Sequence, residues 1–147
     1  MIIKVINVNH YNFTVSDLDR SISFYKEFLG MTLLDCSERD PEFSIRATGY
    51  SNISLIIAYL VKDDFRLELI EYKHSKTRIT RSGDEATYGH ICLNVTGLLE
   101  FYLDNKDKIK FVSEPLKIPA GPNKDKFMVY IHDPDGNKIE LIDDNKK

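Results

Sequence analysis

The sequence predicts an α+β protein built from two similar halves. Two nine-residue stretches are similar, with histidine, valine and leucine at the same offsets: His-Tyr-Asn-Phe-Thr-Val-Ser-Asp-Leu at residues 10–18 and His-Ile-Cys-Leu-Asn-Val-Thr-Gly-Leu at residues 90–98. A second similar motif lies near the end of each half, Leu-Glu-Leu-Ile at 67–70 and Ile-Glu-Leu-Ile at 139–142. Both halves combine alternating apolar residues, typical of strands, with a helical pattern. Because a duplicated unit determines the architecture, we interpret all other elements relative to this repeat.

Size and charge exclude several classes of protein. The 147 residues are enough for one domain with its own core, and the net charge of −3 gives no general attraction to nucleic acid or anionic membranes. No apolar run is long enough to span a bilayer, and the first residues do not resemble a signal peptide. Cys36 and Cys92 are isolated, as expected of reduced thiols in the cytoplasm. We therefore expect a cytoplasmic protein with a small-molecule partner and no nucleic-acid or membrane partner.

The first half predicts a strand, a helix and then three or more strands. Residues 5–15 alternate, with His10 on the less apolar face of the strand. Ser16 and Asp19 form a capping pattern, an apolar stripe runs from Leu18 to Leu29, and Gly30 ends the helix. Short apolar runs separated by turn residues then predict strands. These runs are Met31 to Leu34, Phe43 to Ala47, Ile53 to Leu60 and Phe65 to Tyr72.

The second half repeats this order after a basic, irregular linker at residues 73–86. We place module 1 at about 5–72 and module 2 at about 87–143 of a single domain. In module 2, a strand carries His90 and a helix lies near 97–108. Further strands are expected near 110–113, 126–132 and 137–142, with a turn at 133–136. A proline-rich loop at 114–122 could cover a cleft.

Two histidines and two glutamates recur at matching places. His10 and His90 lie on the opening strands, whereas Glu68 and Glu140 lie on the closing strands. Imidazole and carboxylate ligands without thiolates suit Zn, Ni, Co, Mn or Fe(II). A strand histidine is more often structural, and a glutamate near a strand end is usually a solvated edge residue. Recurrence of both residue types in matching phase favours one divalent metal ion held by these four residues.

Other polar residues are weaker candidates. Glu71 is the rival of Glu68, but the repeated tetrapeptide selects Glu68. His74 and His132 have no counterpart in the other half, and we interpret them as surface or structural residues. The basic linker is most simply a solvated loop, with an anchor for an anionic substrate tail as its alternative.

Several motifs together resemble the glyoxalase/bleomycin-resistance/extradiol-dioxygenase superfamily, also called vicinal oxygen chelate proteins. In the first half they are His10 with Val-Ser-Asp-Leu at 15–18, Ser-Ile-Ser-Phe-Tyr at 21–25 and Phe-Leu-Gly-Met at 28–31. In the second half they are Tyr-Gly-His-Ile at 88–91 and Asp-Pro-Asp-Gly-Asn-Lys-Ile-Glu-Leu at 133–141. The resemblance covers nearly the whole chain and is much less specific for one activity than for the superfamily.

The resemblance implies two tandem βαβββ modules that form a cupped, partly open barrel, usually in a homodimer. It implies metal ligands at His10, Glu68, His90 and Glu140, within one chain or shared across a dimer. A glutamate at position 68 is similar to lactoylglutathione lyase and methylmalonyl-CoA epimerase. Ring-cleaving dioxygenases and fosfomycin thiol transferases typically use three ligands, and drug-binding members often lack the metal set. The leading expectation is a metal-dependent lyase or isomerase acting by proton transfer on a substrate with vicinal oxygens, and the other activities stay open.

Residue roles follow from the same resemblance. Glu140 is the first candidate for the catalytic base and Glu68 the second. Bacterial lactoylglutathione lyases carry an arginine at the place of Thr14 and a side-chain amide near Tyr72, and neither is present here. Lysines in the second half could serve another anion. The candidate substrate-binding residues are Asn12, Thr14, Tyr72, Lys117 and Lys126.

Overall fold

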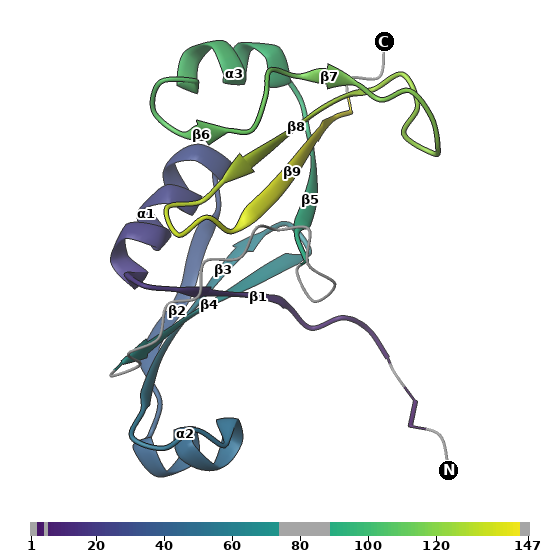
Figure 1. Cartoon of the computed structure of the whole chain (residues 1–147). Helices are drawn as coiled ribbons and strands as arrows, with labels where there is room; N and C mark the ends of the chain where they lie inside the picture. The colour runs from purple at the N-terminus through teal and green to yellow at the C-terminus, as the bar shows by residue number, and fades with distance from the viewer. Residues whose placement is uncertain (1–2, 5, 74–88, 145–147) are drawn as a thin grey trace. The chain divides into compact units, whose positions relative to one another are not determined.

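The computed structural model describes residues 3–4, 6–73 and 89–144, which group into two compact units, residues 1–78 and 79–147. Each unit contains its own β-sheet with one or two helices (Figure 1). The predicted α+β class is therefore confirmed. His74 and the predicted linker beyond residue 73 lie outside the described residues.

The sheet of the first unit has the strand order β1-β4-β3-β2 (Figure 1). β1 and β4 run parallel, whereas β4 with β3 and β3 with β2 are antiparallel. Two parallel strands cannot be joined by a tight turn, so the intervening helices and strands form the connection between them. The strands are β1 (Tyr11–Val15), β2 (Thr32–Glu38), β3 (Ser54–Lys62) and β4 (Phe65–Lys73).

Helix α1 (Leu18–Leu29) follows β1 and packs against β3 and β4. Its N-cap is Asp17, whose carboxylate accepts a hydrogen bond from the Arg20 amide at 3.0 Å, so the predicted cap at Ser16 was one residue early. Gly30 ends the helix in the left-handed conformation at φ 60°, as predicted.

Glu71, the alternative to Glu68 as a metal ligand, binds the backbone at the start of this helix. Its Oε2 accepts a hydrogen bond from the Leu18 amide at 2.8 Å, and its Oε1 lies 2.7 Å from Lys73 Nζ. A carboxylate at this position satisfies an otherwise unpaired helix N–H and interacts favourably with the helix dipole. The structure therefore gives Glu71 a structural role on the helix side of the sheet.

The core of the first unit lies between α1 and the sheet. Alternate residues of β3 and β4, namely Ala58, Leu60, Leu67 and Leu69, are fully buried. Tyr25 on α1 is also fully buried. The other face of β3 and β4 carries a second apolar cluster, Ile53, Leu55 and Ile57, with Tyr59, Ile70 and Tyr72 packed against it. Glu68, one of the predicted metal ligands, lies on this second face opposite Tyr59.

The run Phe43 to Ala47 forms a helix, so the predicted strand was wrong. Helix α2 (Pro41–Thr48) begins at Asp40, whose carboxylate accepts from the Phe43 amide at 2.9 Å, and ends at Gly49 in the left-handed conformation. Proline in the first turn needs no hydrogen-bond partner for its nitrogen, which favours a helix start. The apolar residues suggested a strand, but the flanking caps decide the local structure.

The second unit has the strand order β5-β9-β8-β6, and β7 pairs with β8. Again the opening and closing strands, β5 and β9, are parallel neighbours. Helix α3 (Leu98–Asn105) is shorter than predicted, and β7, in the proline-rich stretch, was missed. The strands are β5 (Ile91–Val95), β6 (Lys110–Phe111), β7 (Leu116–Lys117), β8 (Phe127–His132) and β9 (Lys138–Asp143). None of the helices in the described part of the chain has the length and apolar character needed to cross a membrane.

Replacement of Leu69 by alanine should lower the free energy of unfolding by about 2–5 kcal/mol, because Leu69 is fully buried and the change leaves a cavity. The matched control is Leu34→Ala in β2 of the same unit. Leu34 is 59% exposed, so its replacement should change the free energy of unfolding by no more than about 0.5 kcal/mol. Urea denaturation measures both, and equal effects of the two variants would contradict the assigned core.

Candidate metal-binding site

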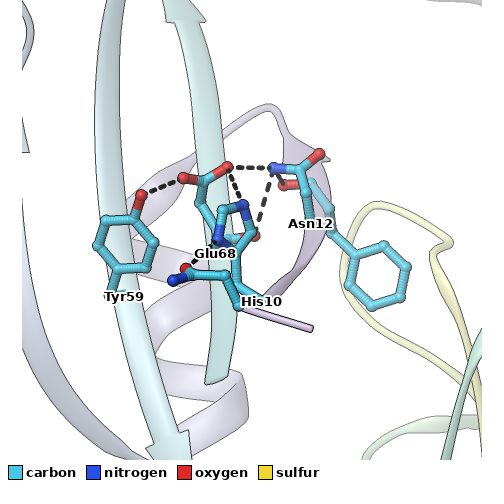
Figure 2. A network of polar contacts seen from close by, with 6 residues as sticks. His10, Asn12, Tyr59 and Glu68 are labelled. Carbon is cyan, nitrogen blue, oxygen red and sulfur yellow. Dashed lines mark hydrogen bonds and ion pairs between the residues drawn. The ribbon is translucent and has the colours of Figure 1, made fainter. Parts of the chain in front are cut away.

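Parallel pairing of β1 with β4 brings His10 to Glu68. Asn12 lies directly opposite Glu68 in the register, and His10 stands just before the start of β1. The His10 Nε2 atom lies 3.4 Å from Glu68 Oε1, and the glutamate is buried (Figure 2). Two residues far apart in the sequence therefore present a nitrogen and an oxygen donor toward each other within one unit.

The other ring nitrogen of His10 faces Asn9. His10 Nδ1 lies 2.8 Å from Asn9 Oδ1, and an amide oxygen only accepts hydrogen bonds, so Nδ1 carries a proton in this contact. In the neutral ring, Nε2 then keeps a lone pair that faces the Glu68 carboxylate. Two lone pairs facing each other repel unless a proton or a cation lies between them. This arrangement suits a metal ligand, whose remote ring nitrogen is commonly held by such a hydrogen bond.

Glu68 has two further partners, and each binds a different carboxylate oxygen. The Tyr59 hydroxyl donates a hydrogen bond to Oε2, whereas the Asn12 amide donates to Oε1 at 3.3 Å (Figure 2). The hydrogen bond to Glu68 raises the pKa of Tyr59, and desolvation by burial raises it further. Tyr59 therefore stays protonated as a donor at neutral pH.

The second unit contains the matching pair. β5 and β9 are parallel with Cys92 opposite Glu140, and His90 Nε2 lies 3.0 Å from Glu140 Oε2. The Tyr130 ring packs edge-on against His90 with the centroids 5.3 Å apart. Burial, with the nearby Glu140 carboxylate, raises the pKa of the Cys92 thiol to about 11, so this thiol is protonated at neutral pH.

The donor atoms fit a divalent ion. Two ligands each about 2.1 Å from one ion and at right angles to each other lie about 3.0 Å apart. The separations in the two units, 3.4 Å and 3.0 Å, are close to this value. Each unit supplies one imidazole and one carboxylate, and no group of three or more potential ligands occurs among the residues that the structure describes. Each pair contains two of the four predicted ligands.

Three residues near these pairs were not predicted. Tyr59 and Tyr130 occupy equivalent register positions opposite Glu68 and Glu140, and Asn9 precedes His10. The repeat contains the tyrosine signal, but the turns between β3 and β4 and between β8 and β9 differ in length. When the two tetrapeptides are aligned without a gap, Tyr59 and Tyr130 therefore do not fall at the same position.

Three of the candidate substrate-binding residues share the sheet face that carries Glu68. Asn12 donates to Glu68, as described above, and Thr14 lies opposite Ile70 on the same face of β1. Tyr72 is half-buried against the apolar cluster, with its ring 6.2 Å from that of Tyr50. Desolvation by burial raises the pKa of Tyr72. The surface beside Glu68 therefore combines an apolar and aromatic cluster with the polar side chains of Asn12 and Thr14, and Arg39 interacts with the Tyr59 hydroxyl.

The lysine candidates are paired with carboxylates of their own unit. Lys117 Nζ lies 3.1 Å from Asp125, and Lys126 forms an ion pair with Asp144. His132 Nδ1 donates to the Gly136 carbonyl at 3.0 Å, in agreement with a structural role in the turn after β8.

Known proteins are similar to this chain over nearly its full length. The metallothiol transferase FosB of Staphylococcus epidermidis is 33% identical over 138 residues, which cover 94% of this chain and 82% of that protein. The lactoylglutathione lyase of Escherichia coli O157:H7 is 33% identical over 139 residues, covering 92% and 90% of the two chains. The crystal structure of a glyoxalase family protein from Bacillus cereus matches with a TM-score of 0.78 at 22% identity, covering 95% of both chains, which supports the fold.

A protein-family model also matches the sequence. The model described as Glyoxalase/Bleomycin resistance protein/Dioxygenase superfamily matches residues 7–141, a range that contains both His–Glu pairs. The repeat, the paired sheets and the similar proteins agree, and the chain belongs to this superfamily.

Proposed function

We propose that this protein is a metal-dependent lyase or isomerase of the glyoxalase type. In this proposal His10 and Glu68, together with His90 and Glu140, hold one divalent ion, Ni, Zn, Co, Mn or Fe. The single observation that carries the proposal is the pair of matching His–Glu contacts, at 3.4 Å and 3.0 Å, from equivalent positions of two similar units. Similarity to lactoylglutathione lyases supports the reaction class. The homodimer and the cytoplasmic location stay predictions.

Each residue has a distinct part in this mechanism. The imidazole Nε2 atoms and the carboxylates bind the ion, which when bound supplies Lewis-acid stabilisation for charge on the vicinal oxygens of a substrate. Glu140 takes a proton from the carbon next to the substrate carbonyl and returns it to the neighbouring carbon, so that the reaction is a net isomerisation. Glu68 is less suited to this task, because Tyr59 donates to its Oε2, and Asn12 and His10 face its Oε1.

Substrate recognition follows from the neighbours of Glu68. Ile70, Tyr72 and the Ile53–Leu55–Ile57 cluster form an apolar wall on that face of the sheet. Lys117 and Lys126 are engaged by Asp125 and Asp144, so an anionic tail would have to compete with these ion pairs. A small substrate whose non-reacting part is apolar fits these residues better than one recognised mainly through negative charge.

A thiol transferase is the second candidate, favoured by the similarity to FosB. By the resemblance described above, such enzymes use two histidines and the last glutamate, so Glu68 would be dispensable. Turnover of the methylglyoxal–glutathione adduct, methylmalonyl-CoA, catechol, and fosfomycin with a thiol separates the superfamily activities. Removal of Glu68 would abolish the first two activities and spare the last two.

Metal titration tests the ligand set directly. Protein purified without a histidine tag and stripped with a chelator should bind Ni²⁺, Zn²⁺ or Co²⁺ in calorimetry. Alanine at His10, Glu68, His90 or Glu140 should each weaken binding by more than the roughly 10- to 100-fold that loss of an outer partner costs. His132→Ala is the matched histidine control and should bind like the wild type, since His132 contacts Gly136. A wild-type chain that binds no ion would favour a metal-free binding protein.

The role of Glu140 is tested by Glu140→Gln, which keeps the side-chain size and one oxygen donor. On the substrate that the wild type turns over, kcat should fall by about 10²- to 10⁴-fold, because the amide cannot accept the substrate proton. The metal content, measured by elemental analysis of the same sample, should be retained. Wild-type turnover by a metal-loaded Glu140→Gln enzyme would exclude Glu140 as the base.

A further inference from the structure

We propose that Tyr59 is a positioning residue that orients the Glu68 carboxylate for metal binding. The proposal rests on the function proposed above, because it concerns the ligand set of the same ion. Tyr59 itself would not touch the ion. It would act through Glu68, by holding Oε2 so that Oε1 is directed to the side of His10.

The register of β3 and β4 places Tyr59 directly opposite Glu68, on the same face of the sheet. The Tyr59 hydroxyl donates to Oε2, and on the other side of the carboxylate Oε1 lies 3.4 Å from His10 Nε2 (Figure 2). Oε2 therefore accepts from Tyr59, whereas Oε1 accepts from the Asn12 amide at 3.3 Å and also faces His10, the second metal donor. A carboxylate held in this way offers one oxygen to a cation in one orientation.

The tyrosine ring is itself held on two sides. It packs against the apolar cluster of Ile53, Leu55 and Ile57, and it contacts the His10 ring edge-on, with centroids 5.7 Å apart and an interplanar angle of 71°. The ring position therefore determines where the hydroxyl lies before any metal binds. Preorganisation of this kind lowers the cost of orienting a ligand when the ion arrives.

The two units differ at this point. Tyr130 occupies the equivalent position opposite Glu140, but its ring contacts His90 edge-on and has Lys138 Nζ 5.3 Å from its centroid. Among the described residues, a tyrosine hydroxyl donates to a candidate ligand carboxylate in the first unit, from Tyr59 to Glu68. We infer that Glu68 is held as a fixed ligand, whereas the Glu140 carboxylate is not held by its tyrosine.

The test uses Tyr59→Phe, which removes the hydroxyl and keeps the ring. Co²⁺ binding to the chelator-stripped full chain is followed by competition with a chromophoric chelator and by the visible absorption of bound Co²⁺. Tyr59→Phe should raise the Kd for Co²⁺ by about 10- to 100-fold and shift the absorption band, since the carboxylate can rotate. The control is Tyr11→Phe, in β1 on the opposite face of the sheet, which should change neither.

A double-mutant cycle separates positioning from general stability. If Tyr59 acts through Glu68, then in the Glu68→Ala background the change Tyr59→Phe should leave the Kd for Co²⁺ unaltered. An undiminished effect in that background would overturn the proposal, as would a Tyr59→Phe protein with wild-type Kd and spectrum. Circular dichroism checks the fold of each variant, and Tyr59→Leu, which also lacks the hydroxyl, replaces Tyr59→Phe if that variant does not fold.

The two proposals fail in different ways. A wild-type chain that binds no Co²⁺, Ni²⁺ or Zn²⁺ would overturn the metal-dependent function, and the role of Tyr59 with it. A wild-type chain that binds Co²⁺ through the four ligands, with Tyr59→Phe indistinguishable from it, would overturn the role of Tyr59 alone.

Discussion

The parallel pairing of the first and last strands of each unit is the constraint on which the rest of the structure depends. β1 lies beside β4, and β5 lies beside β9. Because the paired strands run in the same direction, the residue before the opening strand reaches the glutamate near the middle of the closing strand. Everything between the two strands, including α1 and the antiparallel hairpin, forms the connection that a parallel pair requires.

A buried carboxylate determines the surroundings of the first His–Glu pair. Moving an ionised glutamate away from water is unfavourable unless other groups replace its hydration. Glu68 is buried beside an apolar cluster, and Tyr59, Asn12 and His10 surround its two oxygens. Glu71 lies on the other face of the same strand, where the Leu18 amide and Lys73 compensate for the hydration that its carboxylate loses. Two glutamates three residues apart therefore have different roles because they belong to different faces of one strand.

Membership of the superfamily limits the chemistry without selecting one reaction. A metallothiol transferase and a lactoylglutathione lyase are both 33% identical to this chain, although their names describe different reactions. A fold of this kind supports many activities, so function has to be argued from the site. The two units share the His–Glu pair but differ around it, since Asn12 corresponds to Cys92 and Asn9 to Gly89. These differences, with the tyrosine contacts, distinguish the surroundings of the two pairs.

The sequence by itself determined the repeat, the α+β class and the four recurring residues, because strand periodicity and duplicated phrases are local patterns. It also identified the end of α1 at Gly30, where the left-handed backbone favours glycine. It failed at Phe43 to Ala47, because apolar composition alone does not separate a short helix from a strand, and there the caps at Asp40 and Gly49 decide. The repeat predicted a shared site for His10 and Glu68, and the tertiary structure shows their direct contact. Only the tertiary structure placed the Glu71 carboxylate at the start of α1 and the Tyr59 hydroxyl at Glu68. Those contacts depend on strand register and side-chain direction, which pair residues far apart in the chain and leave no local signal.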